Sequence, residues 1–139
     1  MVSCLYLAEN FPPNISANVV FRVNTDSESV YSLTVTDPGD NITLTLQEQP
    51  QNSNLKLAGD GEYTFYWNLS EPTTEPLVFI ATDMSGASTS FVPTVEVCAC
   101  VNGGNCTLDG VVTSNSTVVL NCQCPQGKFI LYYIDMLWI

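Results

Sequence analysis

The placement of the cysteines is the feature that most constrains the fold of this chain. The protein has 139 residues and six cysteines. Five of them are clustered near the carboxyl end, namely Cys98, Cys100, Cys106, Cys122 and Cys124. Cysteines at this density indicate a small unit in which disulfides supply the rigidity that a small core cannot. Six cysteines can pair in many ways, and the sequence alone does not choose among them.

The cysteine-poor region upstream has the pattern of short β-strands. Ile42, Leu44 and Leu46 alternate with polar residues, which is typical of a half-buried strand. Further strands are predicted in the segments 19–23, 30–35, 62–67, 77–81 and 87–97. Turns are predicted at 37–41, 59–61 and 83–86, and a polar loop at 47–54. Short strands at this spacing predict an all-β fold with an antiparallel β-sandwich, and a barrel or an irregular β domain is the alternative.

Composition argues against several classes of function. The chain carries three basic and fourteen acidic residues, a net charge of −11, and no histidine. Nucleic acids and anionic membrane surfaces both require basic residues in their partners. Without histidine, a serine or cysteine nucleophile would need a lysine or carboxylate as its base, and neither Lys56 nor Lys128 lies in such a motif. We therefore predict a protein that is not an enzyme, with no catalytic residues and no cofactor.

Asn-x-Ser/Thr sequons indicate the compartment. Five are present, at Asn14, Asn41, Asn68, Asn105 and Asn115. We predict N-glycans at Asn14, Asn41, Asn68 and Asn115, whereas a bridged cysteine inside the Asn105 sequon would keep the glycosylation enzyme away. Together with the clustered cysteines, the sequons favour an extracellular location, as a secreted protein or an ectodomain, over an Asn-rich cytosolic protein.

Two motifs in the cysteine cluster resemble an epidermal-growth-factor-like (EGF-like) module. They are Asn102-Gly-Gly-Asn-Cys106 and Cys122-Gln-Cys-Pro-Gln-Gly127. The resemblance covers residues 98–127 and implies the disulfides Cys98–Cys106 and Cys100–Cys122. The closing cysteine of the family is absent, which leaves Cys124 without a partner. We expect Cys4 and Cys124 to be free or intermolecular thiols, with a bridge between the two as the alternative.

The region before this module is similar to cadherin-like and immunoglobulin-like β-sandwiches. The segments Tyr31–Asp40 and Phe79–Gly86 carry the resemblance. A sandwich followed by the run from Pro93 to Cys106 looks like the membrane-proximal part of mucin-like adhesion proteins with von Willebrand factor type D regions. The implied organisation is a lead-in at 1–16, a sandwich at 17–97, the truncated EGF-like module at 98–127 and an apolar tail at 128–139.

Acidic turn residues raise the question of calcium, which cadherins bind between domains. Asp37, Asp40 and Asp83 all lie in predicted turns, and Glu96 lies just before Cys98. Calcium requires six to eight convergent oxygen ligands, and the acidic motifs typical of cadherins and of calcium-binding EGF-like modules are absent. We predict ordinary turns and no metal site, with calcium binding as the alternative.

These observations favour a non-catalytic extracellular module for adhesion or structure, a piece of a mucin-like or EGF-repeat surface glycoprotein. Its expected partners are other extracellular or matrix proteins and neighbouring domains of a larger parent chain. No membrane span is expected, since the apolar run 129–139 is shorter than the about twenty residues that a membrane helix needs. The alternative function is a receptor-binding ligand that acts through its EGF-like module.

Overall fold

The computed structural model describes residues 11–25, 27–37, 41–73, 75–100, 105–112 and 116–123. All the regular structure in these residues is β. The strands are β1 (Asn14–Ala17), β2 (Val20–Asn24), β3 (Ser29–Thr36), β4 (Ile42–Leu46), β5 (Ser53–Gly59), β6 (Glu62–Trp67), β7 (Phe79–Asp83), β8 (Ser88–Phe91), β9 (Thr94–Cys98), β10 (Asn105–Val112) and β11 (Thr117–Gln123). The predicted all-β class is confirmed.

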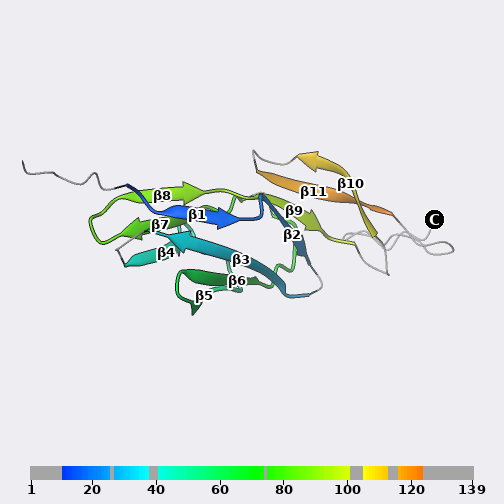
Figure 1. Cartoon of the computed structure of the whole chain (residues 1–139). Coiled ribbons are helices and arrows are strands. Elements are labelled where there is room, and N and C mark those ends of the chain that lie inside the picture. Colours follow the sequence, from blue (N-terminus) through cyan, green and yellow to red (C-terminus); the bar gives the residue numbers. More distant parts are fainter. Residues whose placement is uncertain are drawn as a thin grey trace, which may run out of the picture.

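The strands form three sheets (Figure 1). Their orders are β1-β3-β6-β5, β4-β7-β8 and β10-β11-β9-β2. Most neighbours are antiparallel, but β9 pairs in parallel with both β2 and β11. The consecutive strands β1 and β2 belong to different sheets, so the chain crosses from one sheet to another near Asn18.

One hydrophobic core is shared by the three sheets. Along β3, buried and exposed residues alternate strictly, which places Tyr31, Leu33 and Val35 on the inner face. Phe65 on β6 meets Phe79 on β7 edge to face, with ring centroids 5.4 Å apart. The complete cluster is Phe21, Val23, Tyr31, Leu33, Val35, Leu44, Phe65, Trp67, Leu77, Phe79, Ala81, Val95 and Val97. In the segment 62–67, Phe65 and Trp67 are the buried residues of the strand.

Two predicted turns are confirmed by their backbone geometry. Gly86 has a φ of 91° in the β7–β8 turn, and Gly61 has a φ of 73° in the β5–β6 turn. At Gly61 the backbone also passes close to β3, because a Cβ atom there would lie 2.5 Å from the carbonyl oxygen of Val35. Only glycine meets both conditions without strain.

Several strand predictions differ from the structure. Strand β1 lies mostly within the predicted lead-in 1–16, and β5 begins inside the predicted loop 47–54. Both are edge strands of their sheet, so they bury few residues and show little hydrophobic alternation. The predicted single strand 87–97 is divided into β8 and β9 at Pro93, which has no N–H to donate to a ladder.

The cysteine-rich segment joins the sheet that holds β9. Thr117 and Val119 of β11 pair with Val95 and Val97 of β9, in parallel. Thr117 is fully buried, and Val119 packs against the hydrophobic core. Hydrogen bonding between strands therefore continues across position 98, where the sequence suggested the start of a separate module.

Some predicted features lie outside the described residues. These are the tail 128–139, Cys4, Cys124, Asp40 and Asn115. In the part of the chain that the structure describes, no helix is long and apolar enough to cross a membrane.

Tyr31 is the buried titratable group of the core. Its ring stacks on Phe21 with centroids 4.6 Å apart, and its hydroxyl donates a hydrogen bond to the carbonyl oxygen of Asn18. Burial disfavours the phenolate and raises the pKa of Tyr31 from 10.0 to about 12. The bond to Asn18 ties β3 to the crossing between β1 and β2.

We expect this tyrosine to make the protein sensitive to alkali. The unfolded chain loses the Tyr31 proton near pH 10, whereas the folded chain loses it only near pH 12. The contribution of Tyr31 to the unfolding free energy is therefore fully present below pH 10 and decreases as the pH rises above 10. The fall in unfolding free energy by pH 12 should be about 2 kcal/mol. Urea unfolding at a series of pH values measures it.

The variant Tyr31→Phe should have an unfolding free energy lower by about 1 kcal/mol at pH 9. Its unfolding free energy should fall less at alkaline pH than that of the wild type. Parallel pH curves for the two proteins would contradict the assignment.

Candidate functional site

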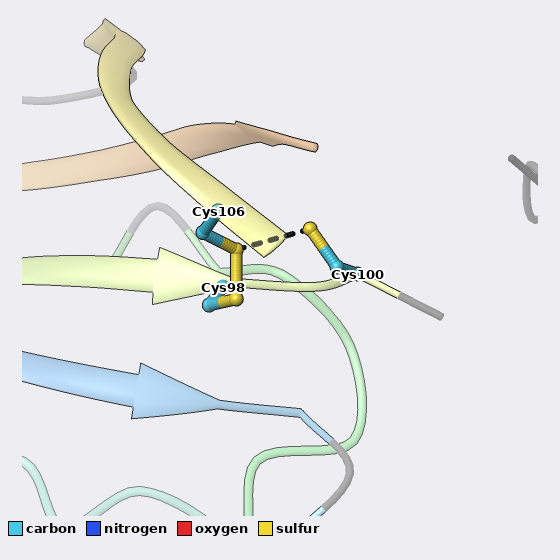
Figure 2. Close-up of side chains that lie close together, drawn as sticks. All are labelled: Cys98, Cys100 and Cys106. Carbon is cyan, nitrogen blue, oxygen red and sulfur yellow. Dashed lines mark hydrogen bonds between the residues drawn. A yellow bond between two sulfur atoms is a disulfide. The ribbon is translucent and has the colours of Figure 1, made fainter. Parts of the chain in front are cut away.

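A cluster of cysteines lies where β9, β10 and β11 come together (Figure 2). Two disulfides form there, Cys98–Cys106 and Cys100–Cys122. Their Cα–Cα separations, 5.7 and 5.4 Å, are normal for such bridges. These are the two pairs that the EGF-like resemblance implies.

The strand register explains how the bridges work together. Cys106 on β10 and Cys122 on β11 are directly opposite each other in the hairpin. Cys106 is bonded to Cys98, the last residue of β9, and Cys122 is bonded to Cys100, two residues beyond it. Both strands of the hairpin are therefore joined covalently to the strand that leaves the core.

The two bridges also touch. The Sγ atoms of Cys100 and Cys106 are 3.1 Å apart, the separation drawn as a dashed line in Figure 2. Neither sulfur carries a hydrogen when both bridges are formed, so this is a contact between two disulfides and not a hydrogen bond. The close contact leaves little room for the end of β9 to move against the hairpin.

The same sulfur atoms have the spacing of a metal site. The Sγ atoms of Cys98, Cys100 and Cys106 lie within 4.8 Å of one another. Thiolates in such a group would suit zinc. Metal binding requires deprotonated thiols, however, and in the bridged form these sulfur atoms are already bonded to other sulfur atoms. In this state the cluster acts as a covalent link.

The acidic residues that suggested calcium do not converge. Among the described residues, the three cysteines are the one group of His, Cys, Asp or Glu close enough to share an ion. The Oδ1 atom of Asp83 accepts hydrogen bonds from the backbone N–H groups of Ser85 and Ala87, both at 2.9 Å. Asp83 thus organises the β7–β8 turn. Glu96 pairs at 3.0 Å with Arg22, across the β2–β9 ladder.

The sequon asparagines that the structure describes are exposed. Asn14 begins β1, Asn41 precedes β4, Asn68 follows β6 and Asn105 begins β10. Exposure is the condition that the glycosylation enzyme requires. The sites are spread over different edges and loops of the molecule.

Two surface hollows were not foreseen from the sequence. One, of about 320 Å³, lies between the loops 47–52 and 68–77 and is lined by Glu48, Glu71 and Glu75. The other, of about 790 Å³, is a groove beside Asn41. Both are formed by segments that are far apart in the chain, so no local sequence pattern predicts them.

In its bridged form the cysteine cluster has a structural role. Disulfide sulfur atoms provide neither a thiolate nucleophile nor an acid–base group. They hold the hairpin in register with β9 and close the loops between them.

No protein-family profile matches the chain.

Proposed function

We propose that the chain is a non-catalytic extracellular module with an adhesive or structural role, part of a glycosylated surface protein. In this proposal an immunoglobulin-like or cadherin-like β-sandwich continues into a disulfide-linked hairpin of EGF-like type. The observation that carries the proposal is the sheet β2-β9-β11-β10, which extends from the core to the hairpin and has both disulfides at its end. A continuous sheet closed by covalent links makes a stiff connection between the two parts.

The strand order supports the sandwich part of the proposal. In immunoglobulin-type sandwiches one sheet has the order A-B-E-D and the other the order C-F-G. The order β1-β3-β6-β5 corresponds to the first sheet, and β4-β7-β8 corresponds to the second. The core residues Phe65 and Phe79 come from these two sheets and pack against each other, as in a sandwich.

The parallel pairing of β2 with β9 supports a role under load. Strand β2 lies near the start of the described chain, and β9 leads to the cysteine cluster. Tension between these two points would pull the parallel strands in opposite directions along their length. The ladder from Val20 to Asn24, paired with Thr94 to Cys98, would then be loaded in shear, so that its hydrogen bonds resist together. The ion pair of Arg22 with Glu96 crosses the same ladder.

An adhesion assay with the complete chain tests the proposal. The chain, secreted from eukaryotic cells behind an added signal sequence, is immobilised on beads and presented to cells and to matrix. We expect bead retention above that of albumin-coated beads, because many weak contacts act together on a bead. The double variant Cys98→Ser and Cys106→Ser is the matched control, and its retention should be lower, because the hairpin loses one link to β9.

A different result would favour a receptor ligand. If the soluble monomer binds cells saturably and activates a receptor, while beads hold no better than albumin, the adhesive role is wrong. The complete chain is used because β11 pairs with β9, and an isolated segment 98–127 would lack that neighbour.

A further inference from the structure

A groove lies at the end of the sheets where several turns meet. It has a volume of about 790 Å³, within the range of about 300–1,000 Å³ that is typical of ligand sites. Its lining comes from the end of β3, the start of β4, the β5–β6 turn and the β7–β8 turn. The residues used in the argument are Asn41, Leu57, Asp60, Tyr63 and Met84.

The groove contains apolar side chains that are exposed to solvent in the unglycosylated protein. Met84 is 74% exposed and Leu57 is 66% exposed, although both have large apolar side chains. The half-buried ring of Tyr63 adds to the same wall, and its hydroxyl donates a hydrogen bond of 3.3 Å to the carbonyl oxygen of Ile42. Grouped exposed apolar side chains of this kind mark sites of contact.

Asn41 places a sequon on the wall of this groove. The sequon is Asn41-Ile42-Thr43, and the side chains of Asn41 and Thr43 are both exposed. The Nδ2 atom of Asn41, to which a glycan would be joined, lies 3.7 Å from the Sδ atom of Met84. A sugar attached at this nitrogen therefore starts beside Met84.

The chemistry of the groove fits a sugar chain. A pyranose ring has a face of C–H groups and a rim of hydroxyls. The groove presents apolar groups on Met84, Leu57 and Tyr63, together with the exposed carboxylate of Asp60. The first can pack against the C–H face, and the second can accept hydrogen bonds from hydroxyls.

We propose that an N-linked glycan on Asn41 packs into this groove and covers Met84 and Leu57. The oligosaccharide comes from a donor of the lipid-pyrophosphate class. A bond forms between C1 of the first sugar and Nδ2 of Asn41, the bond from C1 to the pyrophosphate oxygen breaks, and the amide gives up one proton. The inference depends on the proposed extracellular function, since only the secretory pathway supplies that donor.

Oxidation of Met84 measures whether the groove is covered. The complete chain is secreted from eukaryotic cells as wild type, as Thr43→Ala and as Ser16→Ala. Thr43→Ala removes the sequon at the groove and keeps Asn41, whereas Ser16→Ala removes the sequon of Asn14, which does not line the groove. Each protein is treated with dilute peroxide, and the sulfoxide of Met84 is followed by peptide mass spectrometry.

We expect wild type and Ser16→Ala to oxidise at the same slow rate. Met84 in Thr43→Ala should oxidise faster by about threefold or more, because thioether oxidation follows exposure. Trimming the wild-type glycan to its first sugar should keep part of the protection, because that sugar lies nearest to the sulfur. A methionine-containing peptide added to each reaction provides the reference and should oxidise at the same rate in all three mixtures.

Three outcomes would overturn the inference and leave the proposed function standing. In the first, Asn41 carries a glycan but Met84 oxidises as fast as in Thr43→Ala, so the glycan points into solvent. In the second, Asn14 and Asn68 are glycosylated and Asn41 is not. In the third, Met84 stays protected in Thr43→Ala because the protein dimerises, so a second copy fills the groove. A secreted chain with no glycan at any sequon would count against the proposed function as well.

Discussion

Replacing Phe65 with alanine is expected to lower the free energy of unfolding by about 4 kcal/mol, the usual cost of removing a buried aromatic ring. Phe65 has no exposed surface and lies at the centre of the aromatic core. Its ring contacts Phe79 edge to face at 5.4 Å and Trp67 at 5.9 Å. Because Phe79 belongs to a different sheet, the loss would open a cavity between the sheets. Urea or guanidinium unfolding measures the change.

Phe11→Ala is the matched control, because it makes the same chemical change at a residue that is 68% exposed. Its effect should stay within about 0.5 kcal/mol, the normal range for a surface substitution. Equal losses for the two variants would show that Phe65 is not the core residue that joins the sheets.

Removing the disulfide Cys100–Cys122 should be the second large effect. The bridge closes a sequence separation of 22 residues, against 8 for Cys98–Cys106. The chain-entropy treatment gives about 3.4 kcal/mol for the longer loop and about 2.5 kcal/mol for the shorter. We therefore expect the double variant Cys100→Ser and Cys122→Ser to unfold at lower denaturant than the double variant Cys98→Ser and Cys106→Ser.

Counting free thiols in the same two variants checks the pairing. Removing both members of a true bridge frees no additional thiol, whereas removing one member from each of two bridges frees both of their partners. Titration of the denatured, unreduced proteins should therefore give the wild-type number of thiols in each double variant. Two extra thiols in either variant would show that the bridges connect other cysteines.

Much of the fold could be predicted where a strand has one inner and one outer face. The alternation in β4 appears as expected, with Leu44 buried, and the strand predicted at 62–67 buries Phe65 and Trp67. The turn at Asp83 was also predictable, because aspartate and glycine have local reasons to occupy such positions. These features depend on neighbours within a few residues in the chain.

Edge strands were harder to predict, because they depend on a neighbouring strand and not on residues close by in the chain. In β5, Lys56, Leu57 and Ala58 are all exposed, so its sequence has no clean period of two. Strand β1 has only four residues and directly follows Pro13, and a segment this short shows no clear period. Each of these strands forms because its backbone hydrogen-bonds to a neighbouring strand. The sequence of the segment itself does not indicate that such a neighbour exists.

The sequence by itself determined the β class, the inward residues of the central strands, and the presence of a cysteine cluster and sequons. Only the tertiary structure decided that β9 lies between β2 and β11, and that Asn41 and Met84 share one groove. The period of a pattern reports which face of a strand is apolar. It does not report which strand, over 70 positions away in the case of Arg22 and Glu96, will be the neighbour. That choice is made by the packing of the whole chain, because one arrangement must satisfy the core and the backbone hydrogen bonds together.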